Sequence, residues 1–248
     1  MRIGIISDIH SNLEALQAIY SKLEEAKVDR IVCLGDIVGY GPDPVACIDF
    51  LIDHKIRSIK GNHDVFAIDI TRKLEWNMQK TAEIMILWSQ KKIDQKRRDW
   101  LDKLPLQMKY AGIQMVHASM ECVTGEYWPY ILDQSTAQMH FYLQESRVAF
   151  CGHLHIPLLF SAADGNIKMQ VLKRKKIPQK IAAKFLISVG SVGQPRDMDW
   201  RAAAAIYNTE NNTIDSIRTE YDVDAVLAKF RRPGMPNVNP ERIFRSRN

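Results

Sequence analysis

The chain has 248 residues, of which 46% are hydrophobic and 25% are charged, as in an ordinary folded globular protein. This composition excludes an intrinsically disordered chain, a collagen-like repeat and a long coiled coil. The net charge of +5 is compatible with anionic substrates. It is too small to indicate a nucleic-acid-binding protein, so we expect no stable nucleic-acid partner.

The N-terminal apolar run ends at Ile6, which is too short for a signal peptide, and no apolar run reaches the roughly 18 residues of a membrane-spanning helix. We therefore expect no membrane partner and a cytoplasmic location. The four cysteines form no CxxC pair, and their wide spacing favours reduced, packed thiols over a disulfide framework. They are Cys33, Cys47, Cys122 and Cys151.

Short apolar runs alternate with helical patterns over the first 60 residues. Strands are predicted at residues 2–6, 30–34 and 57–60, and helices are predicted after Asn12, as an N-cap, and near residues 45–53. This alternation is typical of βαβ units, so the sequence predicts an α/β fold with parallel strands in a buried sheet.

Residues 65–104 are a polar, helical block that interrupts this alternation. We expect two or three inserted helices here, which either cap the functional site or form a homo-oligomer interface. The candidate apolar anchors of the block are Trp76, Ile84, Leu87, Trp88 and Leu101.

The chain beyond Pro105 is predicted to be mainly β-structure, with one helix near residues 133–143. A last helix is predicted at residues 221–232, followed by a basic tail to residue 248. The strands predicted in this part are 108–110, 114–117, 148–151, 158–162, 168–173, 183–188, 203–208 and 213–220.

Polar side chains follow the ends of several predicted strands. In open α/β sheets, ligands bind beyond the carboxyl ends of the strands, so we expect these side chains to meet at one place. Glycines beside them would let the backbone turn sharply. The segments are Asp8-Ile9-His10, Gly35-Asp36, Gly61-Asn62-His63-Asp64, Val116-His117 and Gly152-His153-Leu154-His155.

The spacing within two of these segments favours a metal site. In an extended segment, residues two apart point to the same side, so Asp8 can act together with His10, and His153 with His155. Imidazole and carboxylate groups are the usual ligands of Mn, Fe, Co, Ni and Zn. Each segment alone is a weak signal, whereas the five together in this order are specific.

The five segments resemble the signature of the calcineurin-like metallophosphoesterase superfamily, which reads DxH, GD, GNH(D/E), H and GHxH. The stretches at residues 35–44 and 190–197 extend the likeness to a bacterial and archaeal branch of small phosphoesterases, often described as related to diadenosine tetraphosphate hydrolases. The resemblance implies an α/β fold of the four-layer α+β sandwich type, in which two mixed sheets pack face to face and are flanked by helices. It also implies a single domain over residues 1–248, with the helical insertion at about 65–104 and a C-terminal helix and tail at about 221–248.

The resemblance further implies a centre of two divalent metal ions, with Mn²⁺ or Fe favoured and Zn²⁺, Co²⁺ or Ni²⁺ as alternatives. Asp36 would bridge both ions, because a carboxylate has two oxygens. Ala118 and Leu154 depart from the residues common in the family, which affects loop geometry and removes no ligand. The ligands implied for the first metal are Asp8, His10 and His155, and those for the second are Asn62, His117 and His153.

His63 is implied as the catalytic acid, oriented by Asp64. The alternatives are a third ligand of the second metal for His63 and a helix cap for Asp64. Arg196 is a candidate phosphate contact, with a surface ion pair as an equally good account. A base could stack on an aromatic loop residue, or these residues could simply pack in their loops. The candidates are Tyr40, Tyr127, Trp128 and Tyr130.

The function implied is hydrolysis of phosphoester or phosphoanhydride bonds in a small phosphorylated, nucleotide-type substrate, by a hydroxide that bridges the two metals. The enzyme would be a phosphodiesterase or phosphatase, with dinucleoside polyphosphate hydrolase among the options. The alternatives are a nuclease of the same superfamily and a binding scaffold without catalysis. The sequence does not choose among the substrates, the metals or the oligomeric states.

Overall fold

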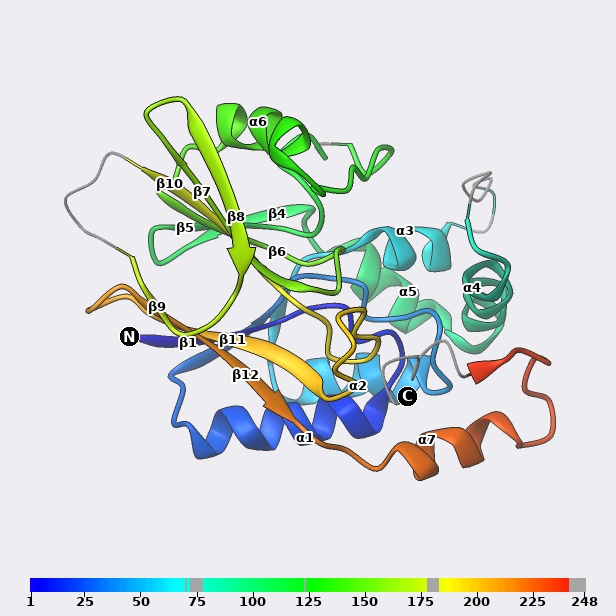
Figure 1. Cartoon of the computed structure of the whole chain (residues 1–248). Coiled ribbons are helices and arrows are strands. Elements are labelled where there is room, and N and C mark those ends of the chain that lie inside the picture. The colour runs from blue at the N-terminus through cyan, green and yellow to red at the C-terminus, as the bar shows by residue number, and fades with distance from the viewer. Residues whose placement is uncertain (70, 72–77, 123, 178–182, 241–248) are drawn as a thin grey trace.

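The computed structural model describes residues 1–69, 71, 78–122, 124–177 and 183–240. In this part of the chain two six-stranded sheets pack face to face (Figure 1). The first sheet has the strand order β3-β2-β1-β11-β12-β9, and the second has the order β4-β5-β6-β10-β7-β8. The expected architecture of two packed mixed sheets flanked by helices is therefore confirmed.

The first sheet contains the strands expected at the start of the chain. β1, β2 and β3 run parallel, as predicted, while β11 runs antiparallel to β1 and makes the sheet mixed. The short strand β9 was not predicted, because its two lysines carry no apolar pattern. The strands are β1 (Arg2–Ile6), β2 (Arg30–Cys33), β3 (Arg57–Ser58), β9 (Lys175–Lys176), β11 (Ala202–Asn208) and β12 (Thr213–Thr219).

The second sheet is built around three parallel strands, β5, β6 and β10, with antiparallel neighbours on both sides. Parallel strands end at a common edge, so the loops after β5 and β6 lie close together. The strands are β4 (Gln107–Tyr110), β5 (Ile113–Val116), β6 (Val148–Cys151), β7 (Pro157–Ala163), β8 (Asn166–Val171) and β10 (Lys184–Val189).

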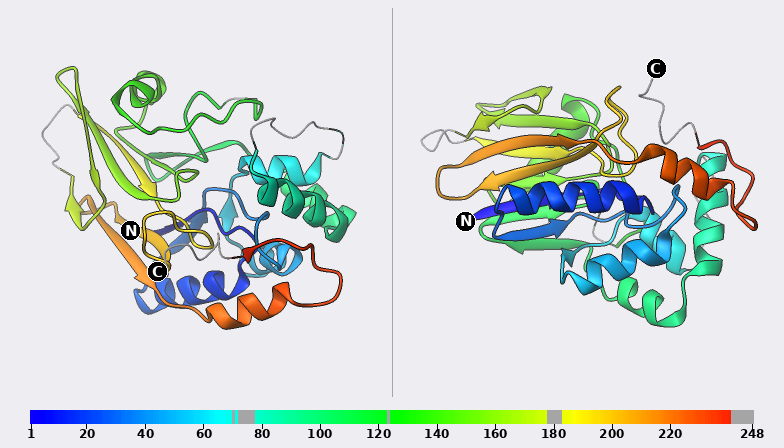
Figure 2. Two further views of the ribbon diagram at one scale, coloured as in Figure 1. Left: turned by 45° about the vertical axis from the view of Figure 1, so that its right-hand side comes forward. Right: turned by 90° about the horizontal axis from the view of Figure 1, so that it is seen from below.

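Helices cover the outer faces of the two sheets (Figure 2). α1 (Leu13–Glu25) and α2 (Pro44–Asp53) pack on the first sheet, α7 (Val223–Phe230) lies beside α1, and α6 (Gln134–Leu143) packs on the second sheet. Alternation along each strand divides its apolar side chains between the two faces. In β1, Ile3 and Ile5 enter the core between the sheets, and Ile6 faces the helices.

Among the described residues of the predicted helical insertion there are three helices, in agreement with the two or three expected. They are α3 (Asn62–Ile68), α4 (Lys80–Lys92) and α5 (Gln95–Asp102). The prediction of Leu101 as a buried anchor is confirmed, but α4 turns a different face to the core than we expected. Its buried residues are Ala82, Met85, Ile86 and Ser89, whereas Leu87 is exposed and Ile84 and Trp88 are only half-buried. Trp76 lies outside the described residues.

Two arginines of α5 attach the insertion to the rest of the fold. Arg97 donates to both carboxylate oxygens of Asp49 on α2, at 2.8 and 2.6 Å. Arg98 donates to the carbonyl oxygens of Ala67, at 3.2 Å, and Gln90, at the ends of α3 and α4. These contacts hold α3 in place, and α3 begins at Asn62. Whether the insertion caps the site or forms a homo-oligomer interface stays a prediction.

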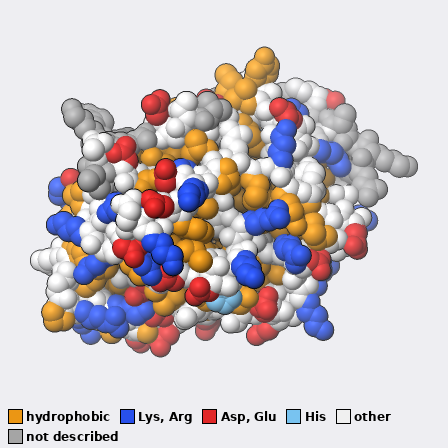
Figure 3. All heavy atoms as spheres, turned by 180° about the vertical axis from the view of Figure 1, so that it is seen from behind, with side chains coloured by type: hydrophobic (Ala, Val, Ile, Leu, Met, Phe, Trp, Pro, Cys, Tyr) orange, Lys and Arg blue, Asp and Glu red, His pale blue; other side chains and the backbone are white. Residues whose placement is uncertain are grey.

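Other expectations can be checked against the described residues. All four cysteines are buried and free, as predicted. None of the described helices has the length and hydropathy needed to cross a bilayer. On the face shown in Figure 3, basic and acidic side chains are intermixed with apolar ones, in keeping with the modest net charge.

Candidate metal centre

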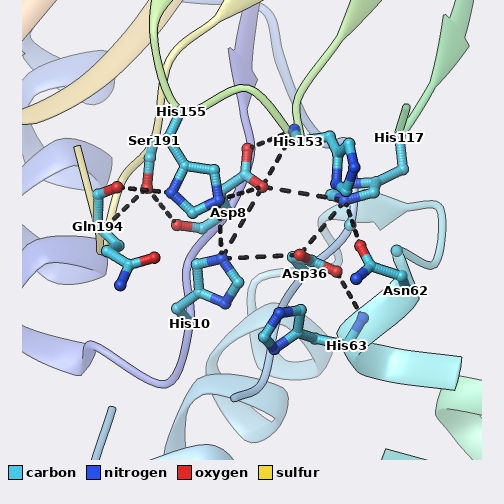
Figure 4. A network of polar contacts seen from close by, with 12 residues as sticks. Asp8, His10, Asp36, Asn62, His63, His117, His153, His155, Ser191 and Gln194 are labelled. Atoms are coloured by element: carbon cyan, nitrogen blue, oxygen red, sulfur yellow. Dashed lines mark hydrogen bonds and ion pairs between the residues drawn. The ribbon is translucent and has the colours of Figure 1, made fainter. Parts of the chain in front are cut away.

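The predicted polar segments meet at the carboxyl edge of the two sheets (Figure 4). Two sets of donor atoms each lie within 4.8 Å of one another, and all of these residues are buried. One set comes from Asp8, His10, Asp36 and His155, and the other comes from Asp36, His117 and His153. Asn62 joins the second set, since its Oδ1 lies 3.2 Å from His117 Nε2. We call Asp8, His10 and His155 the first group, and Asn62, His117 and His153 the second group.

The spacing of the donor atoms fits metal ions. His155 Nε2 lies 3.3 Å from Asp8 Oδ1 and 3.2 Å from His10 Nε2. Ligands that hold one ion at about 2.1 Å in tetrahedral or octahedral geometry lie about 3.0–3.5 Å apart. In the second group, the buried His153 Nε2 has no hydrogen-bond partner among the described residues. A buried nitrogen of this kind is expected to have a partner, and a metal ion would satisfy it.

Asp36 lies between the two groups. Its Oδ2 is 3.6 Å from His10 Nε2 and 3.3 Å from His117 Nε2. Its Oδ1 instead accepts a hydrogen bond from the backbone amide of His63, at 2.9 Å. A single oxygen of Asp36 therefore faces both groups, and bridging of two ions by Asp36 stays a prediction.

The backbone of the site is not extended. Asp8, His10, Asp36, His153 and His155 all have φ between 48° and 64°. The argument that residues two apart share one side of an extended segment is therefore wrong here, although the side chains do converge. A non-glycine residue in this left-handed region costs about 1–3 kcal/mol, and such residues concentrate at functional sites.

Two glycines are required by close approach to the carboxylates. A Cβ on Gly61 would lie 2.2 Å from Asp36 Oδ1, and a Cβ on Gly152 would lie 2.6 Å from Asp8 Oδ2. Neither glycine has a positive φ. Their role is to leave room for Asp36 and Asp8 beside the neighbouring loop, and not to permit a sharp turn.

Backbone carbonyl groups orient three histidines of the two donor groups. The Nδ1 atoms of His10, His117 and His155 lie 3.2, 2.8 and 2.6 Å from carbonyl oxygens. Donation from Nδ1–H leaves the lone pair of Nε2 directed toward the donor groups, which is the usual arrangement for metal-binding histidines. The accepting carbonyl groups belong to Val38, Leu34 and Gln194, respectively.

The loop after β10 supports the first group, which the sequence did not reveal. Ser191 Oγ donates to the carbonyl oxygen of Asp8 at 2.8 Å and accepts from the amide of Gln194 at 2.7 Å. The carbonyl oxygen of Gln194 in turn holds His155. The resemblance singled out residues 190–197, and the sequence offered Arg196 as a phosphate contact, but these hydrogen bonds of Ser191 and Gln194 were not predicted.

His63 lies beside the donor groups and belongs to neither donor set. Its ring is 4.7 Å from the ring of His10 and 5.0 Å from that of Tyr40, measured between centroids. Both oxygens of Asp64 accept from backbone amides, Oδ2 from Gly61 at 2.9 Å and Oδ1 from Ile37 at 2.9 Å. These contacts match the capping alternative for Asp64, and direct orientation of His63 by Asp64 stays a prediction.

The electrostatics of the site favour a cation between the carboxylates. Burial opposes the ionisation of Asp36, but the nearby histidines, His117 above all, hold the pKa of its carboxyl well below the usual value. Burial lowers the pKa of His117, but Asp36 and Asp8 outweigh it and raise that pKa to about 9. Burial, followed by the charge of His117, lowers the pKa of His153 to about 3. Positive charge is thus stabilised at His117, which lies beside Asp36 and Asp8, whereas His153 is kept neutral.

The two predicted substrate contacts flank the centre in different ways. Tyr40 is only 4% exposed and packs its ring edge-on against His10, with centroids 4.9 Å apart. Arg196 is exposed, and its guanidinium donates to Gln194 Oε1 at 3.2 Å. Its charge lowers the pKa of His155, after burial, so Arg196 lies within electrostatic reach of the first group. Substrate contact by either residue stays a prediction.

Comparisons with known proteins agree with this geometry. The model of the calcineurin-like phosphoesterase superfamily domain matches residues 1–212. An uncharacterized protein of Methanocaldococcus jannaschii is 34% identical over 247 residues, which cover 99% of this chain and 98% of the relative. The crystal structure of a metallophosphoesterase from Sphaerobacter thermophilus is similar, with 30% identity, 99% coverage of both chains and a TM-score of 0.81. A hypothetical protein from Pyrococcus horikoshii shares the fold, with 18% identity, coverage of 95% and 94%, and a TM-score of 0.72.

Proposed function

Because the chain belongs to the calcineurin-like phosphoesterase superfamily and is a metallophosphoesterase, we propose that it hydrolyses phosphoester or phosphoanhydride bonds of small, nucleotide-type substrates at a two-metal centre. The observation that carries this proposal is the position of Asp36 Oδ2, which faces both donor groups. His63 lies next to this arrangement without belonging to either donor set.

The residues present fit two divalent ions. The first group with Asp36 offers two imidazole nitrogens and two carboxylates, and the second group with Asp36 offers two imidazole nitrogens, an amide oxygen and the shared carboxylate. Such mixed nitrogen and oxygen donors suit Mn²⁺ or Fe, and also Zn²⁺, Co²⁺ or Ni²⁺. When bound, the ions would supply Lewis acidity toward phosphate oxygens and lower the pKa of water.

His63 is the residue proposed to donate a proton. In hydrolysis an oxygen derived from water bonds to phosphorus, the bond to the leaving oxygen breaks, and that oxygen takes a proton from the His63 ring. Burial lowers the pKa of His63 to about 4, although Asp36 opposes this. An anionic phosphate bound beside the ring would raise this pKa again and favour the protonated form.

The leaving group of the substrate tests this role. We expect His63→Asn to lower kcat for an ester with a poor leaving group, such as thymidine 5′-monophosphate, by about 10²–10⁴-fold. The loss should be far smaller for 4-nitrophenyl phosphate, because nitrophenolate departs readily without a proton. Metal analysis should find two ions per chain in both proteins.

Two results would count against this assignment. Equal losses on both substrates would show that His63 does not act as the acid, and loss of an ion would return it to the alternative role of ligand. Asp64→Asn provides the companion measurement, because it keeps the size of the side chain. If Asp64 acts on His63, that variant shows the same dependence on the leaving group in weaker form.

The substrate class needs a panel assay. After chelation and addition of Mn²⁺, the rates should be compared for a nucleoside monophosphate, a cyclic nucleotide, a dinucleoside polyphosphate and a sugar phosphate. Activity confined to the sugar phosphate would contradict the proposal of a nucleotide-type substrate while leaving the phosphoesterase assignment in place.

A further inference from the structure

An aromatic loop covers the second donor group. It joins β5 to α6 and includes Trp128 and Tyr130. The ring of Tyr130 stacks on the ring of His153, with centroids 3.9 Å apart and planes inclined by 25°. The ring of Trp128 meets His117 edge-on, with centroids 5.7 Å apart. Both histidines of the second group therefore lie against aromatic side chains of one loop.

Trp128 and Tyr130 differ in how much of the side chain is exposed and available to a ligand. Trp128 is only 6% exposed, and its Nε1 donates to the carbonyl oxygen of Gly125 at 3.1 Å, so its packing is already satisfied within the loop. Tyr130 uses one face of its ring for His153, yet 43% of the residue remains exposed. Tyr127 is more exposed still, at 62%, but among the described contacts Tyr130 is the exposed tyrosine that touches a ligand residue.

Tyr130 and His63 belong to opposite ends of the centre. His63 packs against His10 of the first group, whereas Tyr130 packs against His153 of the second. A phosphate placed over Asp36 would direct its leaving oxygen toward His63. A second substituent on the phosphorus, which is retained in the product, would then extend toward the Tyr130 end.

We propose that the outward face of Tyr130 stacks the nucleobase of the retained nucleoside, so that the enzyme prefers nucleoside phosphodiesters and anhydrides to esters with an aliphatic substituent in that place. This inference rests on the proposed function. The base would lie on the face of Tyr130 that points away from His153, and the ribose would link it to the phosphate. Stacking accepts any base, because every base has a π-face. We therefore expect selection for an aromatic base and little selection among the bases.

Two diesters with the same leaving group test the proposal. Thymidine 5′-(4-nitrophenyl phosphate) and ethyl 4-nitrophenyl phosphate carry the same charge and release the same nitrophenolate, and they differ in the retained substituent. We expect wild-type kcat/KM to favour the thymidine ester, mainly through KM. Tyr130→Ala should reduce this preference by about five- to a hundredfold, and Tyr130→Phe should keep it because the ring remains.

The ratio of the two rates separates base stacking from support of His153. Damage to the second group would slow both diesters equally and leave the preference unchanged, and that result would overturn the proposal. The same holds if the wild-type enzyme shows no preference. Tyr142→Ala is the matched control, since Tyr142 is an 81% exposed tyrosine on α6. Failure of the wild-type enzyme to hydrolyse either diester while it still hydrolyses 4-nitrophenyl phosphate would also overturn the proposal, whereas failure on all three esters would count against the proposed function itself.

Discussion

The two donor groups of the metal centre differ in how their histidine rings are held. In the first group, both His10 and His155 are fixed through Nδ1 by backbone carbonyl oxygens. In the second group, His117 is fixed in this way, whereas His153 stacks on the partly exposed ring of Tyr130. A carbonyl group within a buried loop has a set position, while an exposed side chain can move.

This difference suggests a division of roles between the two groups. The first group is determined by the backbone, with Ser191 connecting Asp8 to the loop after β10. In the second group, His153 packs instead against Tyr130, a partly exposed side chain at which we propose that substrate binds. We therefore expect the first group to bind its ion more tightly, and the second group to respond more strongly to substrate and to changes in the aromatic loop.

Replacement of Asp36 should weaken metal binding at both groups, because Asp36 faces both of them. Asp36→Asn keeps the shape but takes away the negative charge that faces both groups. We expect the number of tightly bound ions to fall from two to at most one per chain, and kcat to fall about a thousandfold, since metal-based charge stabilisation contributes several kcal/mol. Metal analysis of dialysed protein together with a 4-nitrophenyl ester assay provides the measurement.

A surface aspartate gives the control for this substitution. Asp164 lies in the exposed turn between β7 and β8, and Asp164→Asn should retain both ions and normal kcat. Two ions retained in Asp36→Asn would mean that Asp36 Oδ2 is not shared, and the two groups would then have to be treated as separate sites.

Removal of a support should affect one group more than the other. Ser191→Ala deletes the hydroxyl that links Asp8 to Gln194. Loss of such an outer partner lowers metal affinity by about 10–100-fold, and we expect this loss at the first group only. Titration of chelated protein with Mn²⁺, followed by calorimetry, should resolve two affinities in the wild type and show which one weakens.

The same titration of Ser21→Ala, an exposed serine on α1, should give wild-type affinities. An equal loss at both groups in Ser191→Ala would contradict the division between a backbone-determined group and an adaptable one, because it would show that the loop after β10 supports the centre as a whole.

The convergence of these Asp and His side chains was predictable because their chemical types are rare and follow strand ends. Asp8, His10, His117 and His153 each follow an apolar run, and the carboxyl edge of a sheet brings such positions together. The local conformation was not predictable in the same way. Positive φ at Asp8 and His10 costs free energy that only the surrounding fold can offset, and no short pattern in the sequence encodes that support.

The insertion shows a different limit of sequence analysis. Ile84, Leu87 and Trp88 are spaced correctly for one face of a helix, and the helix exists, but Met85 and Ile86 are the residues that are buried. Periodicity predicts that a helix is amphipathic. Which face is buried depends on the neighbouring helices, and here α5 holds the ends of α3 and α4 through Arg98.

The smallest effect that we expect is on the pH dependence of stability, and it arises at His140 on α6, behind the second group. His140 is fully buried, and burial lowers its pKa to about 4. Its Nδ1 accepts from the amide of Met120 at 3.3 Å, in the loop that follows His117. The unfolded chain, with a histidine pKa of about 6.5, binds more protons than the folded protein between these values. Stability should therefore fall as pH drops below 6.5.

From pH 8 to pH 6 this histidine alone should cost about 1 kcal/mol of unfolding free energy. Urea denaturation of chelated wild type and His140→Gln at both pH values measures the difference, because the contributions of the other histidines cancel between the two proteins. A His140→Gln variant that loses as much stability as the wild type on acidification would show that His140 protonates without unfolding, and that the layer behind the second group is more open to water than its burial indicates.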